Sequence, residues 1–263
     1  MRNEFASGGS GVGVAERETS DSADVVSLVA LRRTARVTGM WYLALAISGL
    51  VGFLLIRPQI FVAGEPAATL ANLVNEAPLA RLGLVAELAL VITQALAAVW
   101  FYKLFRLSNH VAAWALAVFG LMNAAAIMAS AAFLATALAV SGEPGLAPGG
   151  DAAGLVQLMY ELSSNSWGVG ALFFGLWLIP MGYLVTDSDL MPVWLGRILM
   201  IGGLGYLVSA FVSYGLAAAP GWLVEGLTVP ATIGEFWMII YLLAVGVRRD
   251  SDSIQKPSPV RQH

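Results

Sequence analysis

Two long apolar runs separated by a short polar turn dominate residues 173–211 of this chain. The turn is Asp187-Ser188-Asp189, and Pro192 follows it, where a helix cannot easily continue. The flanking apolar segments, 167–186 and 193–215, each reach the length of about 20 residues that a helix needs to cross a ~30 Å hydrocarbon layer. The pattern therefore predicts a helical hairpin inside a membrane.

Charged residues are too scarce in the whole chain for a water-soluble fold. They make up 12% of its 263 residues, against 58% hydrophobic residues, whereas soluble domains carry roughly 25% charged residues. The apolar segments are 37–56, 82–102, 111–140, 167–186, 193–215 and 223–247. We predict an all-α, polytopic membrane helix bundle of about six transmembrane helices over residues 31–249, with short interfacial helices in the outer loops 58–81 and 141–165. Disordered tails are expected at 1–30 and 250–263.

The distribution of basic residues predicts the orientation of this bundle. Cytoplasmic loops of membrane proteins are enriched in Lys and Arg. If both termini are cytoplasmic, all 14 Lys and Arg residues except Arg57 and Arg81 fall on that side. We therefore expect a multi-pass protein of a bacterial inner membrane, with both tails in the cytoplasm.

A few polar side chains within the spans are candidate binding residues, and Glu235 is the strongest of them. A carboxylate near the middle of a span costs at least ~2.5 kcal/mol. At ~1.5 Å per residue, Arg197 lies at a similar depth, which predicts an intramembrane ion pair between the two. Three alternatives stay open: Glu235 is protonated and hydrogen-bonded, the pair only fixes helix packing, or Arg197 reaches the lipid headgroups.

Other polar residues are expected to face the interior or the outer end of the bundle. Glu87 and Gln94 are seven residues apart, so they share one helix face. Gln94 and Asn123 either form hydrogen bonds between helices or contact a ligand. Glu87, Glu161 and Glu225 lie near the outer ends of their spans, where they are either solvated or line a vestibule for a cation.

The sequence predicts no cofactor, no metal site and no nucleic-acid partner. Cysteine is absent, which removes iron–sulfur clusters and thiolate metal sites. His110 is the only histidine outside the C-terminal tail, and no Ser/His/Asp arrangement surrounds it. No basic run with interleaved aromatic residues suggests nucleic acid. We predict no catalytic residues, and an intramembrane enzyme that uses carboxylates alone remains a lesser alternative.

Several apolar blocks follow one another in a recognisable order. They include ARVTGMWYLALAISGL, GEPAATLANLVNEAPLARLGLVAEL, YKLFRLSN, FFGLWLIPMGYLV, LMPVWLG, GGLGYL and IGEFW. In this order and spacing they resemble the family called domain of unknown function 4386, over roughly residues 35–247. The resemblance implies a bacterial multi-span integral membrane protein and carries no known activity.

Two functions remain open at this point. The first is binding or transport of a small solute or ion, of unknown identity, through a polar bundle interior formed by Glu235, Arg197, Glu87, Gln94 and Asn123. The second is a structural or regulatory role without a substrate, in which the chain acts through lipids, partner helices or a helix–helix homo-oligomer. A polar cavity near the membrane midplane that reaches Glu235 would favour the first.

Overall fold

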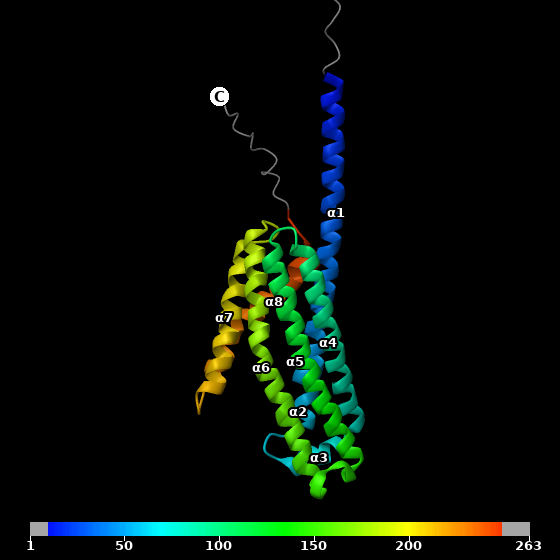
Figure 1. Cartoon of the computed structure of the whole chain (residues 1–263), viewed down its shortest axis with the longest axis vertical. Helices are drawn as coiled ribbons and strands as arrows, with labels where there is room; N and C mark the ends of the chain where they lie inside the picture. The colour runs from blue at the N-terminus through cyan, green and yellow to red at the C-terminus, as the bar shows by residue number, and fades with distance from the viewer. Residues whose placement is uncertain (1–9, 249–263) are drawn as a thin grey trace, which may run out of the picture.

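A computed structural model describes residues 10–248, with side chains from Ser27 onward. This part of the chain is all-α and contains no strand. Its elements, drawn in Figure 1, are α1 (Ser10–Gly49), the π-helix η1 (Leu50–Ile56), α2 (Arg57–Ile60), α3 (Pro66–Asn75), α4 (Ala77–Phe105), α5 (His110–Gly142), the short 3-10 helices η2 (Pro144–Leu146) and η3 (Pro148–Gly150), α6 (Ala152–Asp187), α7 (Val193–Gly215) and α8 (Gly221–Ala244).

The described residues form six helices that are long and apolar enough to cross a membrane, which confirms the predicted fold class. They are Ser27–Ile60, Ala77–Phe105, His110–Gly142, Ala152–Asp187, Val193–Gly215 and Gly221–Ala244. Three of them, Ser27–Ile60, Ala77–Phe105 and Ala152–Asp187, extend well beyond the predicted apolar spans, because hydropathy marks the apolar centre of a helix and not its polar ends. Residues 10–30, predicted to belong to a disordered tail, are part of α1. Residues 1–9 and 249–263 of the predicted tails lie outside the described residues.

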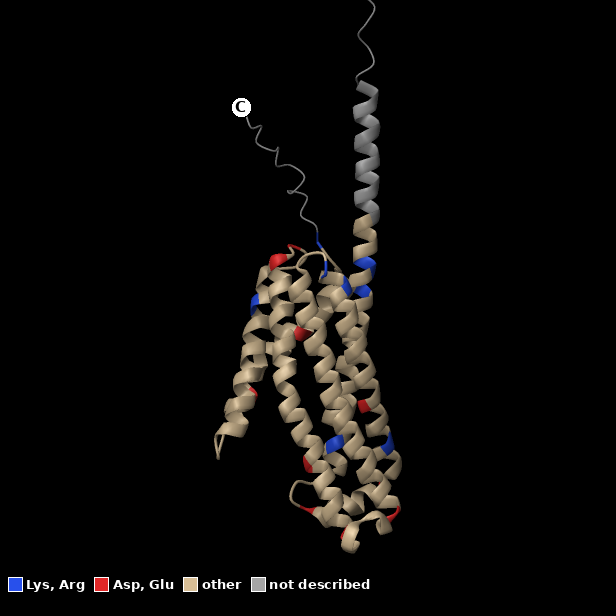
Figure 2. Cartoon of the chain, viewed as in Figure 1, with Lys and Arg blue, Asp and Glu red and all other residues tan. Residues whose placement is uncertain are grey.

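The six spans form a closed ring. Going round it, α1 lies beside α4, and then come α5, α6, α7 and α8, which returns to α1. Near this closure Arg32 Nε donates a hydrogen bond of 3.4 Å to the carbonyl oxygen of Val247, so the start of the first span lies beside the residues that follow the last span. We call this end the basic end and the opposite one the acidic end (Figure 2). The basic end carries Arg32, Arg33, Arg36, Lys103 and Arg106, and the acidic end carries Glu65, Glu76, Glu143, Asp151 and Glu161.

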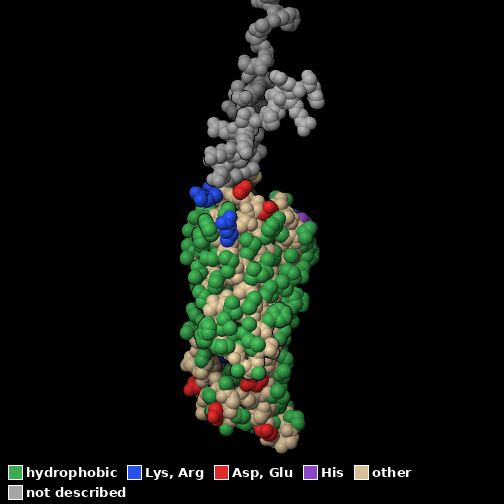
Figure 3. All heavy atoms as spheres, turned by 90° about the vertical axis from the view of Figure 1, so that its left-hand side faces the viewer, with side chains coloured by type: hydrophobic (Ala, Val, Ile, Leu, Met, Phe, Trp, Pro, Cys, Tyr) green, Lys and Arg blue, Asp and Glu red, His purple; other side chains and the backbone are tan. Residues whose placement is uncertain are grey.

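The outer surface between the two ends is apolar. Large hydrophobic side chains are exposed on several spans, for example Ile92 and Ile201, each at 58%. Figure 3 shows that hydrophobic side chains cover the middle of one face while charged side chains gather at its ends. Such a surface requires lipid around it, since soluble proteins rarely expose large contiguous apolar patches. The chain is a multi-pass integral membrane protein.

The hairpin expected over residues 173–211 is formed by α6 and α7, and glycines bring its two helices into backbone contact. A Cβ added at Gly182 would overlap the carbonyl oxygen of Gly196, and one at Gly203 would lie 2.7 Å from that of Gly175. Small residues at such crossings let membrane helices approach closely. Asp189, with φ of 54°, turns the chain between the two helices.

Helix α6 is longer than predicted. The expected short helix does begin after Asp151, whose Oδ1 accepts a hydrogen bond of 2.8 Å from the Gly154 amide. It does not end before the fourth span, however, and continues as one helix to Asp187. The predicted outer loop ended at residue 165, but no proline or glycine interrupts the helix over Ser163-Ser164-Asn165, and Ser163 is buried against the neighbouring α5.

The acidic end contains a second hydrophobic cluster. At ~1.5 Å per residue, α4, α5 and α6 exceed a ~30 Å hydrocarbon layer by at least ~13 Å. Their extra turns pack with α2 and α3 around a buried core that is separate from the main one. The core consists of Ile56, Ile60, Leu73, Ala137, Val140, Ala147, Ala152 and Val156. This arrangement closes the bundle at its acidic end.

Candidate functional site

A cavity of about 710 Å³ lies inside the ring, and all six spans contribute to its wall. Cavities of roughly 300–1,000 Å³ with an apolar lining and a few polar groups are typical of small-molecule sites. Here most of the lining is apolar, and the polar side chains among it are Tyr42, Gln94, Asn123, Ser164, Trp167, Tyr206, Thr232 and Glu235. The cavity is therefore large enough for one small molecule.

The cavity has an open side between η1 and α8. Its lining includes Leu50 and Leu54 of η1 and Phe236 of α8, which are 48%, 61% and 57% exposed. Close contact between α1 and α8 lies nearer the basic end, where a Cβ at Gly39 would meet Leu242 at 2.9 Å. Because the exposed outer surface at this height is the lipid-facing one, the opening leads sideways into the membrane.

Glu235 lies in the cavity wall and is held by Tyr42. The Tyr42 hydroxyl donates a hydrogen bond of 2.6 Å to Glu235 Oε1, joining α1 to α8. The Tyr42 ring is 1% exposed and makes edge contacts with Phe101 and Trp177, at ring-centre distances of 5.3 and 5.5 Å. Tyr42 is therefore a core residue that positions a carboxyl group.

The structure does not form the predicted ion pair between Arg197 and Glu235. Arg197 is exposed on the outside of α7, and its guanidinium carbon lies 4.7 Å from the centre of the Trp194 ring. Trp194 precedes it by three residues, so the two side chains share one outward face of the helix. The argument from equal depth in the membrane carried no information about which face of α7 carries Arg197.

Gln94 supplies a buried amide that has no partner in the described structure. It is fully buried on α4 and lines the cavity, and neither Nε2 nor Oε1 makes a hydrogen bond. The buried indole nitrogen of Trp177 is likewise unpaired, and a Cβ at Gly120 would lie within 3.4 Å of both nitrogens. Buried polar groups are almost always satisfied, so these atoms mark a place that a water or a polar ligand would occupy.

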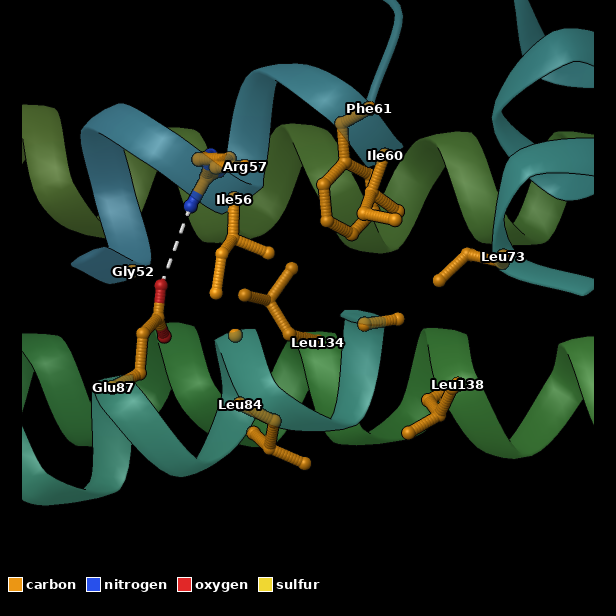
Figure 4. Close-up of a pocket in the computed structure, with 12 residues that line it drawn as sticks. Gly52, Ile56, Arg57, Ile60, Phe61, Leu73, Leu84, Glu87, Leu134 and Leu138 are labelled. Carbon is orange, nitrogen blue, oxygen red and sulfur yellow. Dashed lines mark hydrogen bonds and ion pairs between the residues drawn. The ribbon is translucent and has the colours of Figure 1, made fainter. Parts of the chain in front are cut away.

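A second polar cluster lies nearer the acidic end, and it centres on Arg57 and Glu87. Arg57 Nη1 lies 3.5 Å from Glu87 Oε1, and the two side chains are 9% and 4% exposed (Figure 4). Ser130 Oγ donates to Glu87 Oε2 at 3.2 Å, and Ser163 Oγ lies 2.7 Å from Ser130 Oγ. Arg57 Nη2 donates to Ser164 Oγ at 2.9 Å. One cluster therefore ties together the first four spans.

Aromatic rings surround the Arg57 guanidinium. Its central carbon lies 5.5, 5.8 and 5.0 Å from the ring centres of Phe53, Phe61 and Tyr160. Stacking of this kind is favourable for a desolvated guanidinium.

The cluster also lies between two cavities. Ser164 lines the central cavity, whereas Arg57 and Glu87 line a water-sized cavity of about 20 Å³ towards the acidic end.

The end of the shorter helix α7 shows where this cluster lies along the length of the bundle. Tyr214, next to the last residue of α7, donates a hydrogen bond of 3.2 Å to Asn165 Oδ1 on α6. Ser163 and Ser164 therefore lie near the level where α7 ends. Of the three glutamates expected either to be solvated or to line a vestibule, Glu161 and Glu225 are exposed, whereas Glu87 is buried.

Residues 37–246 match the family described as Domain of unknown function (DUF4386). The chain belongs to this family. The match covers all six spans of the ring together with both polar clusters, and it confirms the resemblance drawn from the order of the apolar blocks.

One curated relative of this DUF4386 chain is an uncharacterized protein of the archaeon Archaeoglobus fulgidus. The two are 33% identical over 76 residues, which is 27% of this chain and 43% of the relative. The matched part thus spans less than half of that protein. No solved structure matches the chain.

The candidate residues predicted from sequence fall into three groups in this DUF4386 structure. Glu235, Gln94 and Asn123 line the central cavity, Glu87 belongs to the cluster near the acidic end, and Arg197 lies outside both.

Sequence reasoning missed Arg57, Tyr42, Ser130 and Ser163 as interior residues. Arg57 was treated as the end of the first span, although its position opposite Glu87 in the predicted topology was a usable signal. For Ser130 and Ser163 no signal was available, because isolated serines in small-residue helices are common.

Proposed function

We propose that the protein binds a small, lipid-soluble molecule in its central cavity, as a membrane-embedded binding or transport protein. The cavity itself is the observation that supports this proposal most strongly. Helix bundles that serve only to hold their helices together fill such space with side chains, because empty volume lowers stability. The unpaired amide of Gln94 in the cavity wall adds a polar group that a ligand would satisfy.

The open side of the cavity supports entry from the bilayer. Exposed apolar residues of η1 and α8 form its two edges, and the Arg57 cluster separates it from the acidic end. A molecule dissolved in the lipid would reach the cavity without crossing this cluster. The alternative, a structural or regulatory protein without a substrate, offers no reason for a lined and laterally open cavity.

We also propose the location and orientation of the chain. The bundle lies in the inner membrane of a bacterial cell with its basic end in the cytoplasm, because Lys and Arg concentrate on that side of membranes. The lateral opening then lies in the half of the bundle towards the outer face, between Glu235 and the Arg57 cluster.

Photolabelling with benzophenone, a small neutral probe, tests the binding function. The full chain is placed in phosphatidylcholine nanodiscs, irradiated with the probe, and the labelled residues are mapped by mass spectrometry. Leu90 and Ile127 line the cavity and are only 4% and 2% exposed, so a probe reaches them from inside the cavity. Met128, 57% exposed to lipid, reports labelling from the bilayer in the same sample.

A cavity-filling variant supplies the control. Ala171→Phe places a ring in the cavity and should reduce labelling of Leu90 and Ile127 relative to Met128. Ala129→Phe adds the same ring on the exposed side of α5 and should leave the ratio unchanged. Labelling confined to lipid-facing residues in the unaltered protein would overturn the proposal.

A further inference from the structure

We infer that the ligand of the central cavity is a lipophilic organic cation, either an amine or an onium ion, with its positive charge beside Glu235. This inference rests on the proposed function of the cavity as a binding site and names the chemical class of its ligand. Four features of the cavity wall carry it, namely the position of the carboxyl group, its lack of a cationic partner, the surrounding rings and the lipid-facing opening.

Glu235 has no cationic partner within the described part of the chain. The salt bridge found there joins Arg57 to Glu87, and Arg197 turns outward over Trp194. The polar groups placed around Glu235 are the hydroxyl of Tyr42 and the cavity-lining side chains of Tyr206 and Thr232, all of which are neutral. A carboxylate inside a membrane protein normally pairs with a positive group or marks a path for one.

The hydrogen bond from Tyr42 occupies one of the two carboxyl oxygens of Glu235. Its length of 2.6 Å falls in the range of 2.5–2.7 Å that is typical of a hydroxyl donating to a carboxylate. Tyr42 bonds to Oε1, and no described hydrogen bond reaches Oε2. The second oxygen is therefore available to a ligand, and Glu235 is half-buried, so that one side of it faces the cavity.

Aromatic rings line the cavity in two contacting pairs. Phe174 and Tyr206 have ring centres 4.9 Å apart, and Phe53 and Trp167 have ring centres 5.1 Å apart. Ring faces attract cations, and this attraction is larger where water is excluded. An organic cation would find the carboxyl group of Glu235 and the rings of Phe174 and Tyr206 in the cavity wall, whereas an organic anion would find no positive side chain among the lining residues.

The shape of the opening agrees with this class of ligand. Its edges are the apolar side chains of Leu50, Leu54 and Phe236, which a hydrated metal ion could not pass without losing its water. An amine can enter the lipid as its neutral base, and an onium ion with large apolar groups shields its charge, so either can pass an apolar opening. The cavity therefore favours lipophilic cations over small inorganic ones.

Two ions of nearly equal size and opposite charge test the inference. Tetraphenylphosphonium and tetraphenylborate are each added to the nanodisc-embedded chain, and their ability to protect Leu90 and Ile127 from benzophenone labelling is measured. We expect tetraphenylphosphonium to protect at concentrations roughly tenfold or more below those needed for tetraphenylborate, because only the cation gains the charge pair. Equal protection by both ions, or stronger protection by the borate, would overturn the inference.

Variants at Glu235 separate charge from shape. Glu235→Gln should weaken protection by the phosphonium roughly tenfold or more, and Glu235→Asp should keep most of it. Glu225→Gln removes an exposed carboxylate from the same helix and should change nothing. Size-exclusion chromatography checks folding, and the comparison of the two ions on the unaltered protein stands even if Glu235→Gln fails to fold.

The two proposals fail in distinguishable ways. If benzophenone reaches Leu90 and Ile127 but Glu235→Gln leaves protection by the phosphonium unchanged, the cavity is a binding site and the ligand is not a cation. If benzophenone never reaches these residues, the binding function itself is wrong.

Discussion

The hydroxyl of Tyr42 on α1 donates a 2.6 Å hydrogen bond to the carboxyl group of Glu235 on α8, so the first and last spans of the chain meet at one polar contact. This contact lies where the ring of helices closes. It also positions the carboxyl group that lines the central cavity. The same hydrogen bond thus affects both the stability of the ring and the chemistry of the cavity.

Removing this hydroxyl should lower stability. Tyr42→Phe keeps the buried ring and deletes the hydrogen bond to Glu235, and hydrogen bonds to charged groups contribute about 1.5–3 kcal/mol. Thermal unfolding in detergent measures the loss, with exposed Tyr183→Phe as the control. In a double-mutant cycle, Tyr42→Phe and Glu235→Gln should be strongly non-additive, and independent effects would show that the contact contributes nothing.

Breaking the pair of Arg57 and Glu87 should be more damaging than removing both charges. Arg57→Met leaves Glu87 buried without its partner, and such changes cost about 3–5 kcal/mol. Replacing both residues by Met should recover most of this loss. Arg81→Met, an exposed charge near the same end, should shift the unfolding free energy by no more than about 0.5 kcal/mol. A double variant as unstable as the single one would contradict the prediction.

The backbone contact between α6 and α7 should not tolerate a methyl group. In Gly182→Ala the new Cβ would overlap the carbonyl oxygen of Gly196, which gives way only if the helices separate, at a cost of about 1–3 kcal/mol. Gly226→Ala, at a helical position with open space around it, should be neutral or stabilising by up to about 1 kcal/mol. Equal melting temperatures for the two variants would refute the close contact.

Cysteine labelling tests the orientation, because the chain has no native cysteine. Ser108→Cys places an exposed thiol at the basic end, and Gly145→Cys places one at the acidic end. In intact bacterial spheroplasts, a membrane-impermeant maleimide should label only the Gly145→Cys variant, and after lysis it should label both variants. Labelling of the Ser108→Cys variant in intact spheroplasts would reverse the proposed topology.

The sequence was sufficient to predict the spans, the hairpin and the burial of several polar residues. Each span contains enough apolar residues to cross a membrane, and Pro192 with Asp187-Ser188-Asp189 located the turn of the hairpin. Glu87 and Gln94 share a face seven residues apart, and the structure buries both of them. These features depend on local composition and helix period, which a single sequence contains.

The same reasoning could not predict which basic residue pairs with Glu87. Arg57 follows the π-helix η1, in which the amide of Arg57 bonds to the carbonyl of Gly52, five residues back. Pro58 has no amide hydrogen, which favours such a departure from the α-helical pattern. Residues beyond Leu50 therefore lie on a different face from the one that a 3.6-residue period predicts, and Arg57 turns inward to Glu87.

The glycine contacts also differ around the ring, being made by backbone atoms among α6, α7 and α8 and by side chains between α1 and α8. Backbone atoms meet at Gly182 and Gly196 between α6 and α7, and at Gly202 and Ala231 between α7 and α8. Such backbone contacts leave little room for these three helices to shift against one another. Between α1 and α8, Gly39 meets only side chains, and side-chain contacts can rearrange. If the cavity widens, we therefore expect α1 to be the helix that moves, and this movement would break the hydrogen bond from Tyr42 to Glu235.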